Sequence, residues 1–204
     1  MAADRALVET TIAIDGVAYR LVNCFLVESL SDVPTAVVEI MAESTGVTPE
    51  ASAVISKPGE VTFKRNDGKG ERSFCGIVVE AERFRPADQA NHRLRLRIAP
   101  KLWRLGKRAD CRIFHEKDVK DIVTAVLEKA GVTDQKWELA GSYEKRKYTA
   151  QYRETDLDFI QRLLAEEGIY FTIDHEGGKD TVHFGDAATG LGDIEGEKIL
   201  PFIH

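Results

Sequence analysis

Hydrophobic and polar residues alternate with a period of two through much of residues 7–103, which is the pattern of strands that bury one face. Asp15-Gly16 lies between two such stretches and predicts a hairpin turn. A second hairpin is expected where the polar segment 66–70 separates residues 61–63 from residues 74–79. The positions expected to share a strand face are Val8, Thr10, Ile12 and Ile14, then Tyr19, Leu21, Asn23, Phe25 and Val27, then Ala36, Val38 and Ile40.

A short helix is expected between these strands. Thr48 offers an N-cap hydroxyl, Pro49 suits the first helical position, and Glu50 lies near the positive end of the helix dipole. The segment 57–59, Lys-Pro-Gly, is expected to end this helix.

The pattern changes to a helical period from about Leu105 onward. An apolar stripe predicts one helix that Gly131 ends; its residues are Val119, Ile122, Val123, Val126, Leu127 and Ala130. Thr155 can cap a second helix with Asp158 at its N3 position and Gly168 at its end. Residues 169–173 and 182–184 then read as a hairpin around the turn 176–180. Helices and antiparallel strands in separate runs predict an α+β fold that is mainly β.

Composition narrows the class of protein. The chain has 204 residues, 43% of them hydrophobic and 30% charged, which is ordinary for a globular protein and excludes a wholly disordered chain. The formal net charge is −6, which opposes generic attraction to phosphate backbones. The first residues lack the pattern of a signal peptide, and no apolar run approaches the roughly 20 residues that span a bilayer. We expect a protein made in the cytosol, with no stable membrane insertion.

Several segments of the chain carry a family resemblance. The run from Gln151 to Phe171 resembles the signature of VgrG proteins, the trimeric spikes of type VI secretion systems. Residues 100–105, residues 112–114 with the following Val119 and Ile122, and the stretch 74–78 match that family in order and spacing. The resemblance spans nearly the whole chain, most strongly from about Phe74 to Asp186.

The resemblance implies a fold like the hub of a contractile phage tail, in which an N-terminal β-barrel precedes an α+β module with two amphipathic helices. The expected domains are a barrel over residues 1–104, an α+β domain over 105–187 with helices near 118–130 and 156–167, and the start of a truncated further barrel or linker over 188–204. Residues 199–203 form an apolar stretch that would be an exposed strand edge there.

The resemblance also implies a function: a structural component of the puncturing spike, whose N-terminal hub region docks on the hexameric Hcp tube and helps deliver effectors. A homotrimer in the full-length protein, a PAAR tip protein, effectors and baseplate proteins are the implied partners. The implied route is assembly in the cytoplasm and secretion through the contractile apparatus without a signal peptide. For the chain as given we expect a monomer or weak oligomer, no enzymatic activity and no cofactor. A hub protein of a contractile phage tail is the nearest alternative.

An acidic hydrolase is a second alternative of another class. Its carboxylates would come from Glu154, Asp156 and Asp158, or from Glu166 and Glu167. Asp156 and Asp158 are better explained as charges that favour the first turn of a helix. Glu166 and Glu167 are adjacent, so on a helix they point about 100° apart and do not easily share one ion.

A barrel that binds nucleic acid or carbohydrate is the third alternative. Its basic residues would be Arg93, Arg95 and Arg97 with Lys145, Arg146 and Lys147. No aromatic residues interleave with the arginine row, and acidic strand residues such as Glu80 and Glu82 are expected to neutralise it, so we interpret it as a solvated strand face. The glycine-containing segment 68–70 is interpreted as a turn, because it lacks the context of a phosphate-binding loop.

Cysteine and histidine offer no recognisable motif. Cys24, Cys75 and Cys111 show no metal-ligand spacing, so we expect reduced packing residues. The histidines show no metal-spaced pair, and each is expected at a surface or a strand end; they are His92, His115, His175, His183 and His204. The sequence therefore predicts no catalytic, cofactor or metal residue and leaves the partner-binding residues undefined.

Overall fold

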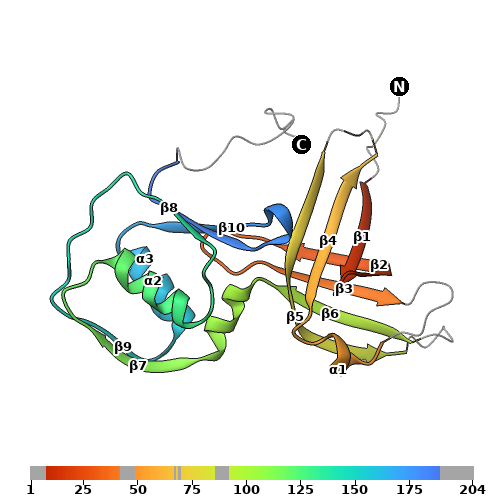
Figure 1. Cartoon of the computed structure of the whole chain (residues 1–204), viewed down its shortest axis with the longest axis horizontal. Helices are drawn as coiled ribbons and strands as arrows, with labels where there is room; N and C mark the ends of the chain where they lie inside the picture. The colour runs from red at the N-terminus through yellow and green to blue at the C-terminus, as the bar shows by residue number, and fades with distance from the viewer. Residues whose placement is uncertain (1–7, 42–48, 67, 69, 86–91, 189–204) are drawn as a thin grey trace, which may run out of the picture.

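Six strands of the described chain close into a barrel (Figure 1). The computed structural model describes residues 8–41, 49–66, 68, 70–85 and 92–188. The barrel order is β1-β2-β3-β6-β5-β4, and each pair of neighbours is antiparallel. The strands are β1 (Val8–Ile14), β2 (Val17–Val27), β3 (Thr35–Met41), β4 (Pro58–Arg65), β5 (Glu71–Phe84) and β6 (Arg93–Ala99).

Both hairpins expected from the alternation are confirmed. Ile14 pairs with Val17 across the turn, where Asp15 and Gly16 both have positive φ, the left-handed conformation that such a two-residue turn requires. β4 pairs with β5 across the polar segment. Inside the barrel, the apolar rows of β1, β3 and β6 are buried; they include Ile12, Ile14, Ala36, Val38, Ile40, Leu94, Leu96 and Ile98.

The face predicted for β2 is correct only for its first half. Tyr19 and Leu21 pack against the barrel core as expected, but the pairing with β3 shifts between Leu21 and Asn23. A shift of one residue exchanges the two faces of a strand, so Cys24 then faces inward and Phe25 is 65% exposed. The expectation that Phe25 and Val27 share the buried face is therefore wrong, because a bulge interrupts the alternation.

The short helix α1 (Ala51–Val54) begins later than the sequence suggested. Glu50 is its N-cap residue and has extended backbone angles, so Pro49 lies before the helix and not at its first position. Thr48, the expected cap, lies outside the described residues. Burial of Val54 in the barrel core fixes where this single turn sits.

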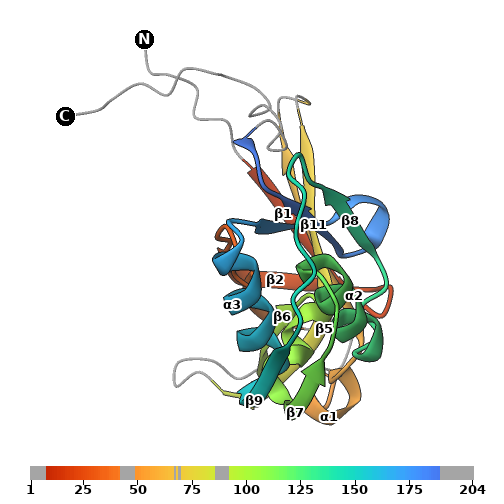
Figure 2. The same ribbon diagram turned by 90° about the vertical axis from the view of Figure 1, so that its left-hand side faces the viewer.

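The remaining elements build an α+β region, which lies beside the barrel in Figure 1 and in front of it in Figure 2. The helices α2 and α3 lie side by side between a three-stranded sheet of order β10-β11-β8 and a ribbon of β7 with β9. The elements are η1 (Lys101–Lys107), β7 (Ala109–Phe114), α2 (Val119–Lys129), β8 (Gln135–Glu138), β9 (Thr149–Thr155), α3 (Asp156–Glu166), β10 (Tyr170–Asp174), η2 (Glu176–Gly178) and β11 (Thr181–Gly185).

Local sequence signals set the ends of both helices. The Thr155 hydroxyl accepts the Asp158 backbone N–H at 3.0 Å, and the Asp118 carboxylate accepts the Asp121 N–H at 2.9 Å. Gly131 and Gly168 follow the helices with positive φ, as expected for helix terminators. The buried stripes pack into one core with Phe171 and Phe184 of the sheet. The fold class, mainly β with two amphipathic helices, is confirmed.

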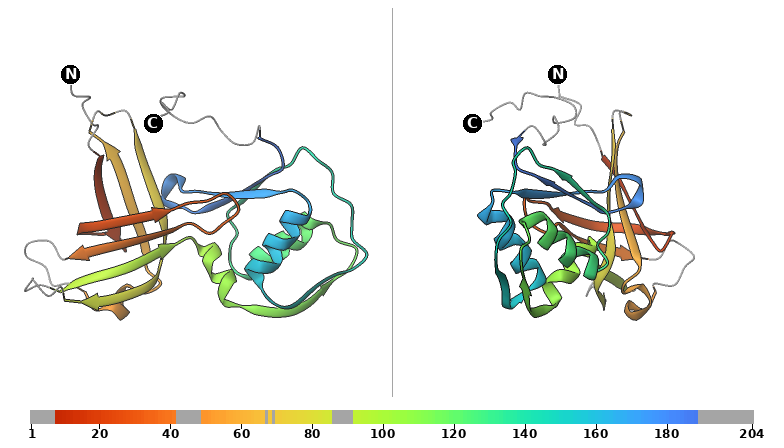
Figure 3. Two further views of the ribbon diagram at one scale, coloured as in Figure 1. Left: turned by 180° about the vertical axis from the view of Figure 1, so that it is seen from behind. Right: turned by 60° about the vertical axis from the view of Figure 1, so that its left-hand side comes forward.

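Two connections interlock the barrel with the α+β region (Figure 3). The β2–β3 connection reaches out of the barrel, where the Ser31 N–H donates to the Phe171 carbonyl at 2.9 Å and the Gln161 side chain donates to the Ser31 carbonyl at 3.0 Å. The β10–β11 connection reaches back, and its residue His175 meets Cys75 of β5. Each region therefore holds a segment of the other.

The domain boundaries at residues 104 and 187 stay predictions. The stretch 199–203 lies outside the described residues. Within the described part of the chain, every helix is too short or too polar to cross a bilayer.

Candidate protein interface

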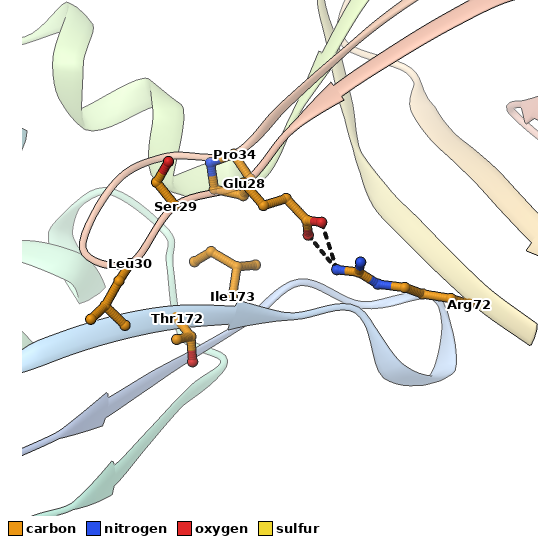
Figure 4. Close-up of a pocket in the computed structure, with 7 residues that line it drawn as sticks. All are labelled: Glu28, Ser29, Leu30, Pro34, Arg72, Thr172 and Ile173. Atoms are coloured by element: carbon orange, nitrogen blue, oxygen red, sulfur yellow. Dashed lines mark hydrogen bonds and ion pairs between the residues drawn. The ribbon is translucent and has the colours of Figure 1, made fainter. Parts of the chain in front are cut away.

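A groove runs along the boundary between the barrel and the α+β region. One part has a volume of about 290 Å³ and is lined by Glu28, Ser29, Leu30, Pro34, Arg72, Thr172 and Ile173 (Figure 4). Across it, Arg72 Nη2 lies 2.6 and 2.7 Å from the two Glu28 carboxylate oxygens. The adjoining part has a volume of about 480 Å³ and also contains Glu71, Ser73, Asp174, His175 and Gly177. The lining combines apolar, polar and charged side chains, a mixture that suits protein contact.

Two apolar surfaces lie on the outer faces of sheets. On the barrel, Phe25 is 65% exposed and Val27 lies beside it on β2. On the β7–β9 ribbon, Tyr152 is 69% and Ile113 is 56% exposed. Large aromatic and aliphatic side chains gathered on an exposed face are typical of contact surfaces. The sequence alternation alone could not separate these faces from buried ones.

The arginine row on β6 is neutralised on the barrel surface, as interpreted from the sequence. Arg97 Nε lies 3.0 Å from Glu80, and Arg95 Nη2 lies 2.9 Å from Glu39. Arg95 also covers the ring of Phe84 at 4.8 Å. The row is an ion-paired strand face with little positive charge left for an anionic polymer.

Asp156 departs from the expectation that it only serves the first turn of a helix. Its side chain is 1% exposed and lies against the ribbon, where Arg112 Nη2 bonds to it and Gln151 Nε2 donates to it at 2.9 Å. Arg108 lies 3.9 Å away. Asp156 lies in the first turn as expected, but it is also buried, because β9 leads straight into α3 and carries the first residue of the helix into the protein. Asp158 lies in the first turn as predicted, where its backbone N–H donates to the capping Thr155 hydroxyl and its carboxylate accepts that hydroxyl at 2.6 Å.

Arginines hold the other candidate carboxylates. Arg162 contacts Glu154 at 2.7 Å and Glu166 at 3.1 Å. Arg146 contacts Glu166 at 2.7 Å and also bonds to Glu167, so one guanidinium joins these two glutamates, and the expectation that they do not easily share a substrate or metal ion stays a prediction. Glu167 has left helical geometry, and a forked guanidinium can reach both carboxylates. Hydrogen bonding from Arg146 lowers the pKa of Glu166. Arg146 is also the central residue of the basic cluster 145–147, and it is ion-paired with both glutamates.

The cysteines and histidines occupy varied environments. The described cysteines are free of disulfides; Cys75 is buried, but Cys111 is exposed on the outer face of β7 and is not the packing residue expected. Burial raises the pKa of the Cys75 thiol to about 11, which leaves it unreactive near neutral pH. His175 directly follows the end of β10, one of the two positions expected, but it is buried, 7% exposed, because the β10–β11 connection packs it against Phe74. His204 lies outside the described residues.

Among the described residues, no group of three or more His, Cys, Asp or Glu side chains is placed so that it could hold a metal ion. His183 Nε2 lies 3.7 Å from Asp174, and the ring of His115 meets Tyr148 edge-on.

Asp186 is a structural residue that no sequence motif singles out. It accepts the backbone N–H groups of Ala140 and Gly141 and the Tyr143 hydroxyl, each at 2.8 Å. These hydrogen bonds lower the pKa of Asp186, and the one from the Ala140 N–H has the largest effect. Burial raises the pKa of the Tyr143 hydroxyl to about 12. The partners lie more than 40 residues away in the sequence, so only the fold brings them together.

The sequence was compared with models of known protein families to identify the family of this chain. The model of the phage tail baseplate hub (GPD) matches residues 27–204. This chain belongs to the phage tail baseplate hub family. The stretch matched includes most of the barrel and all of the α+β region described above.

Curated relatives of this hub chain are type VI secretion spike proteins, which confirms the resemblance to VgrG. VgrG1b of Pseudomonas aeruginosa is 36% identical over 135 residues, which are 66% of this chain and 18% of that protein. A Vibrio cholerae relative named actin cross-linking toxin VgrG1 is 35% identical over 143 residues, 69% of this chain and 13% of that protein. The hub chain thus spans less than a fifth of these relatives.

Solved structures share the hub fold. An Escherichia coli protein described as a type VI secretion component, structurally similar to T4 phage tail proteins gp27 and gp5, has a TM-score of 0.73 at 22% identity; the match covers 89% of this chain and 50% of that chain. A tail protein of Neisseria meningitidis has a TM-score of 0.65 at 12% identity, over 92% of this chain and 53% of that chain.

Proposed function

We propose that this chain is the N-terminal hub part of a type VI secretion spike, with a mechanical and not a catalytic role. The observation that carries the proposal is the 36% identity to a spike protein over 135 residues, on a fold shared with a solved secretion component. The interlocked barrel and α+β region suit a rigid part, because each holds a segment of the other.

A non-enzymatic role is supported by the state of the carboxylates that a hydrolase would use. Each of the four carboxylates Glu154, Asp156, Glu166 and Glu167 is ion-paired with Arg112, Arg146 or Arg162, which supports a structural role for them. The toxin named among the relatives matches this chain over 13% of its length only, and its activity is not carried over to this chain.

The partners we propose are those of a spike. In the full-length protein the chain would be part of a homotrimer that docks on the Hcp tube, with a PAAR tip protein, effectors and baseplate proteins as further partners. Secretion would follow assembly, through the apparatus itself. The described chain alone is proposed to be a monomer or weak oligomer, and sedimentation velocity at micromolar concentration would contradict this if it gave a stable trimer.

A chimaera tests the secretion role. The matched 135-residue stretch of VgrG1b would be replaced by the corresponding stretch of this chain, and export of the chimaera into the medium would be measured in Pseudomonas aeruginosa. We expect export that requires the contractile sheath; the same chimaera in a sheathless strain is the control. A chimaera that folds and trimerises but stays inside cells with a working apparatus would contradict the proposal.

A hub of a contractile phage tail is the second candidate. The family model and the solved tail protein of Neisseria meningitidis support it, but that tail protein is 12% identical to this chain, against 36% for a secretion spike. Phage particles that contain this chain in purified tails, in place of secretion, would favour the phage role.

A further inference from the structure

One edge of strand β5 is open where it faces the α+β region. β5 pairs with β4 over residues 71–77, but its pairing with β6 starts only at Ile77. At Cys75 the backbone N–H therefore has no β6 strand to receive it. The N–H donates instead to His175 Nδ1 at 3.2 Å, so a side chain from the β10–β11 connection completes this edge of the barrel.

His175 makes further contacts at the same place. Its carbonyl oxygen accepts the Cys75 thiol at 3.8 Å, and its ring lies 4.5 Å from the ring of Phe74. The residue is 7% exposed. Because Nδ1 accepts a hydrogen bond, it carries no proton, and the neutral ring must be protonated at Nε2. Nε2 is itself buried and has no hydrogen-bond partner among the described residues.

We propose that His175 is a pH-sensitive latch between the barrel and the α+β region, closed while the imidazole is neutral and released when it is protonated. Protonation at Nδ1 turns the acceptor into a donor that points at the Cys75 N–H. The charged ring would also place two N–H donors in a buried site. The Nδ1–H would face the Cys75 N–H, which is itself a donor, and the Nε2–H would have no acceptor among the described residues. Withdrawing the hairpin into water relieves both costs.

Burial and the charges around His175 determine the direction in which its pKa is shifted. Burial lowers the pKa of His175, and Arg72 lowers it further, whereas Glu28, Asp174 and Asp180 favour the charged ring but do not outweigh burial. Glu60 of β4 and Glu71 of β5 also lie at this edge, and Lys101 Nζ lies 3.7 Å from Asp180. His183 lies beyond Asp174 on the same hairpin.

The sign of the pH dependence follows from this direction. The pKa is depressed in the closed state, so between that value and the ordinary value of about 6.5 the open state binds more protons. The latch is therefore fully closed above about pH 6.5 and weakens as the pH falls, by up to about tenfold in the opening equilibrium per pH unit for one proton. This goes beyond the proposed function, because it concerns rigidity as a function of pH.

Amide hydrogen exchange tests the latch on the full chain. Protection of the Cys75 amide, corrected for the intrinsic rate at each pH, would be followed by NMR from about pH 7.5 to about pH 5. We expect protection to fall below about pH 6.5, up to about tenfold per pH unit, while the Val126 amide in the core of α2 stays protected. Constant protection at Cys75, or a parallel loss at Val126, would overturn the proposal.

The decisive variant is His175→Asn. The Asn side-chain oxygen can accept the Cys75 N–H much as Nδ1 does, but it takes up no proton in this range. We expect the pH dependence at Cys75 to disappear in this variant and to persist in the matched control His183→Asn. The reverse result would overturn the latch. If His175→Asn does not fold, the His175 ring resonances of the unaltered protein decide: they must titrate with the loss of Cys75 protection, and a ring still neutral after protection is lost contradicts the proposal.

Discussion

The barrel and the α+β region solve the same problem, that of satisfying buried polar groups, in different ways. In the barrel each strand finds neighbours on both sides over most of its length, and the charged side chains of β6 stay on the surface. In the α+β region the β7–β9 ribbon has only two strands, and side chains supply the hydrogen bonds to its buried polar groups. Gln151 and Arg112 bond to Asp156 inside the protein. Removing a charge should therefore cost far more in the second region.

The sharpest test of this difference is Arg112→Met. The variant leaves the Asp156 carboxylate buried without its main cation, so we expect the free energy of unfolding to fall by about 3–5 kcal/mol. Urea unfolding followed by circular dichroism measures it. The double variant with Asp156→Asn should recover part of the loss, because the unpaired charge is gone. A double variant no more stable than Arg112→Met would show that the charge is not the cause.

Gly76→Ala is the strongest test within the barrel. A Cβ at this position would lie 2.4 Å from the Ala99 carbonyl oxygen and 2.6 Å from its carbon, and these backbone atoms cannot turn away. We expect a loss of about 1–3 kcal/mol in the free energy of unfolding. Gly106→Ala is the matched control, since its Cβ would meet Leu157 at an ordinary 3.5 Å. Equal thermal midpoints for the two variants would argue against the close strand contact.

Thr155→Ala tests a local signal in the α+β region. The substitution removes the acceptor for the Asp158 N–H, so we expect α3 to lose about 1 kcal/mol of stability. Thr155→Ser keeps the hydroxyl and should remain close to the unaltered protein in thermal melts. Similar midpoints for the Ala and Ser variants would mean that the cap contributes nothing measurable.

The smallest effect is expected on the barrel surface. Arg97 is 41% exposed and Glu80 is 58% exposed, so their pairing should contribute at most about 1 kcal/mol, further weakened by salt. A double-mutant cycle with Arg97→Met and Glu80→Gln, at low and high salt, measures the coupling. A coupling as large as that of Arg112 with Asp156 would erase the contrast between the two regions.

Local sequence signals predicted much of this fold because they act over a few residues. The Asp15-Gly16 turn, the Thr155 cap and the terminators Gly131 and Gly168 each depend on backbone conformations or hydrogen bonds within one turn. The β2 bulge escaped prediction, because two residues then oppose one on β3 and the alternation reverses without a change of composition. The groove of the candidate interface could not be predicted from local signals either, because Glu28, Arg72 and the β10 residues that line it are far apart in the sequence.

By itself the sequence determined the alternating strands, the two amphipathic helices, the Thr155 cap, and the motifs that mark the hub family, since these depend on neighbours along the chain. Only the tertiary structure decided that Asp156 is buried, that Arg146 serves both Glu166 and Glu167, and that His175 completes an edge of the barrel. Burial and pairing of charges depend on groups that are distant in sequence, and a linear pattern carries no record of which of them will meet.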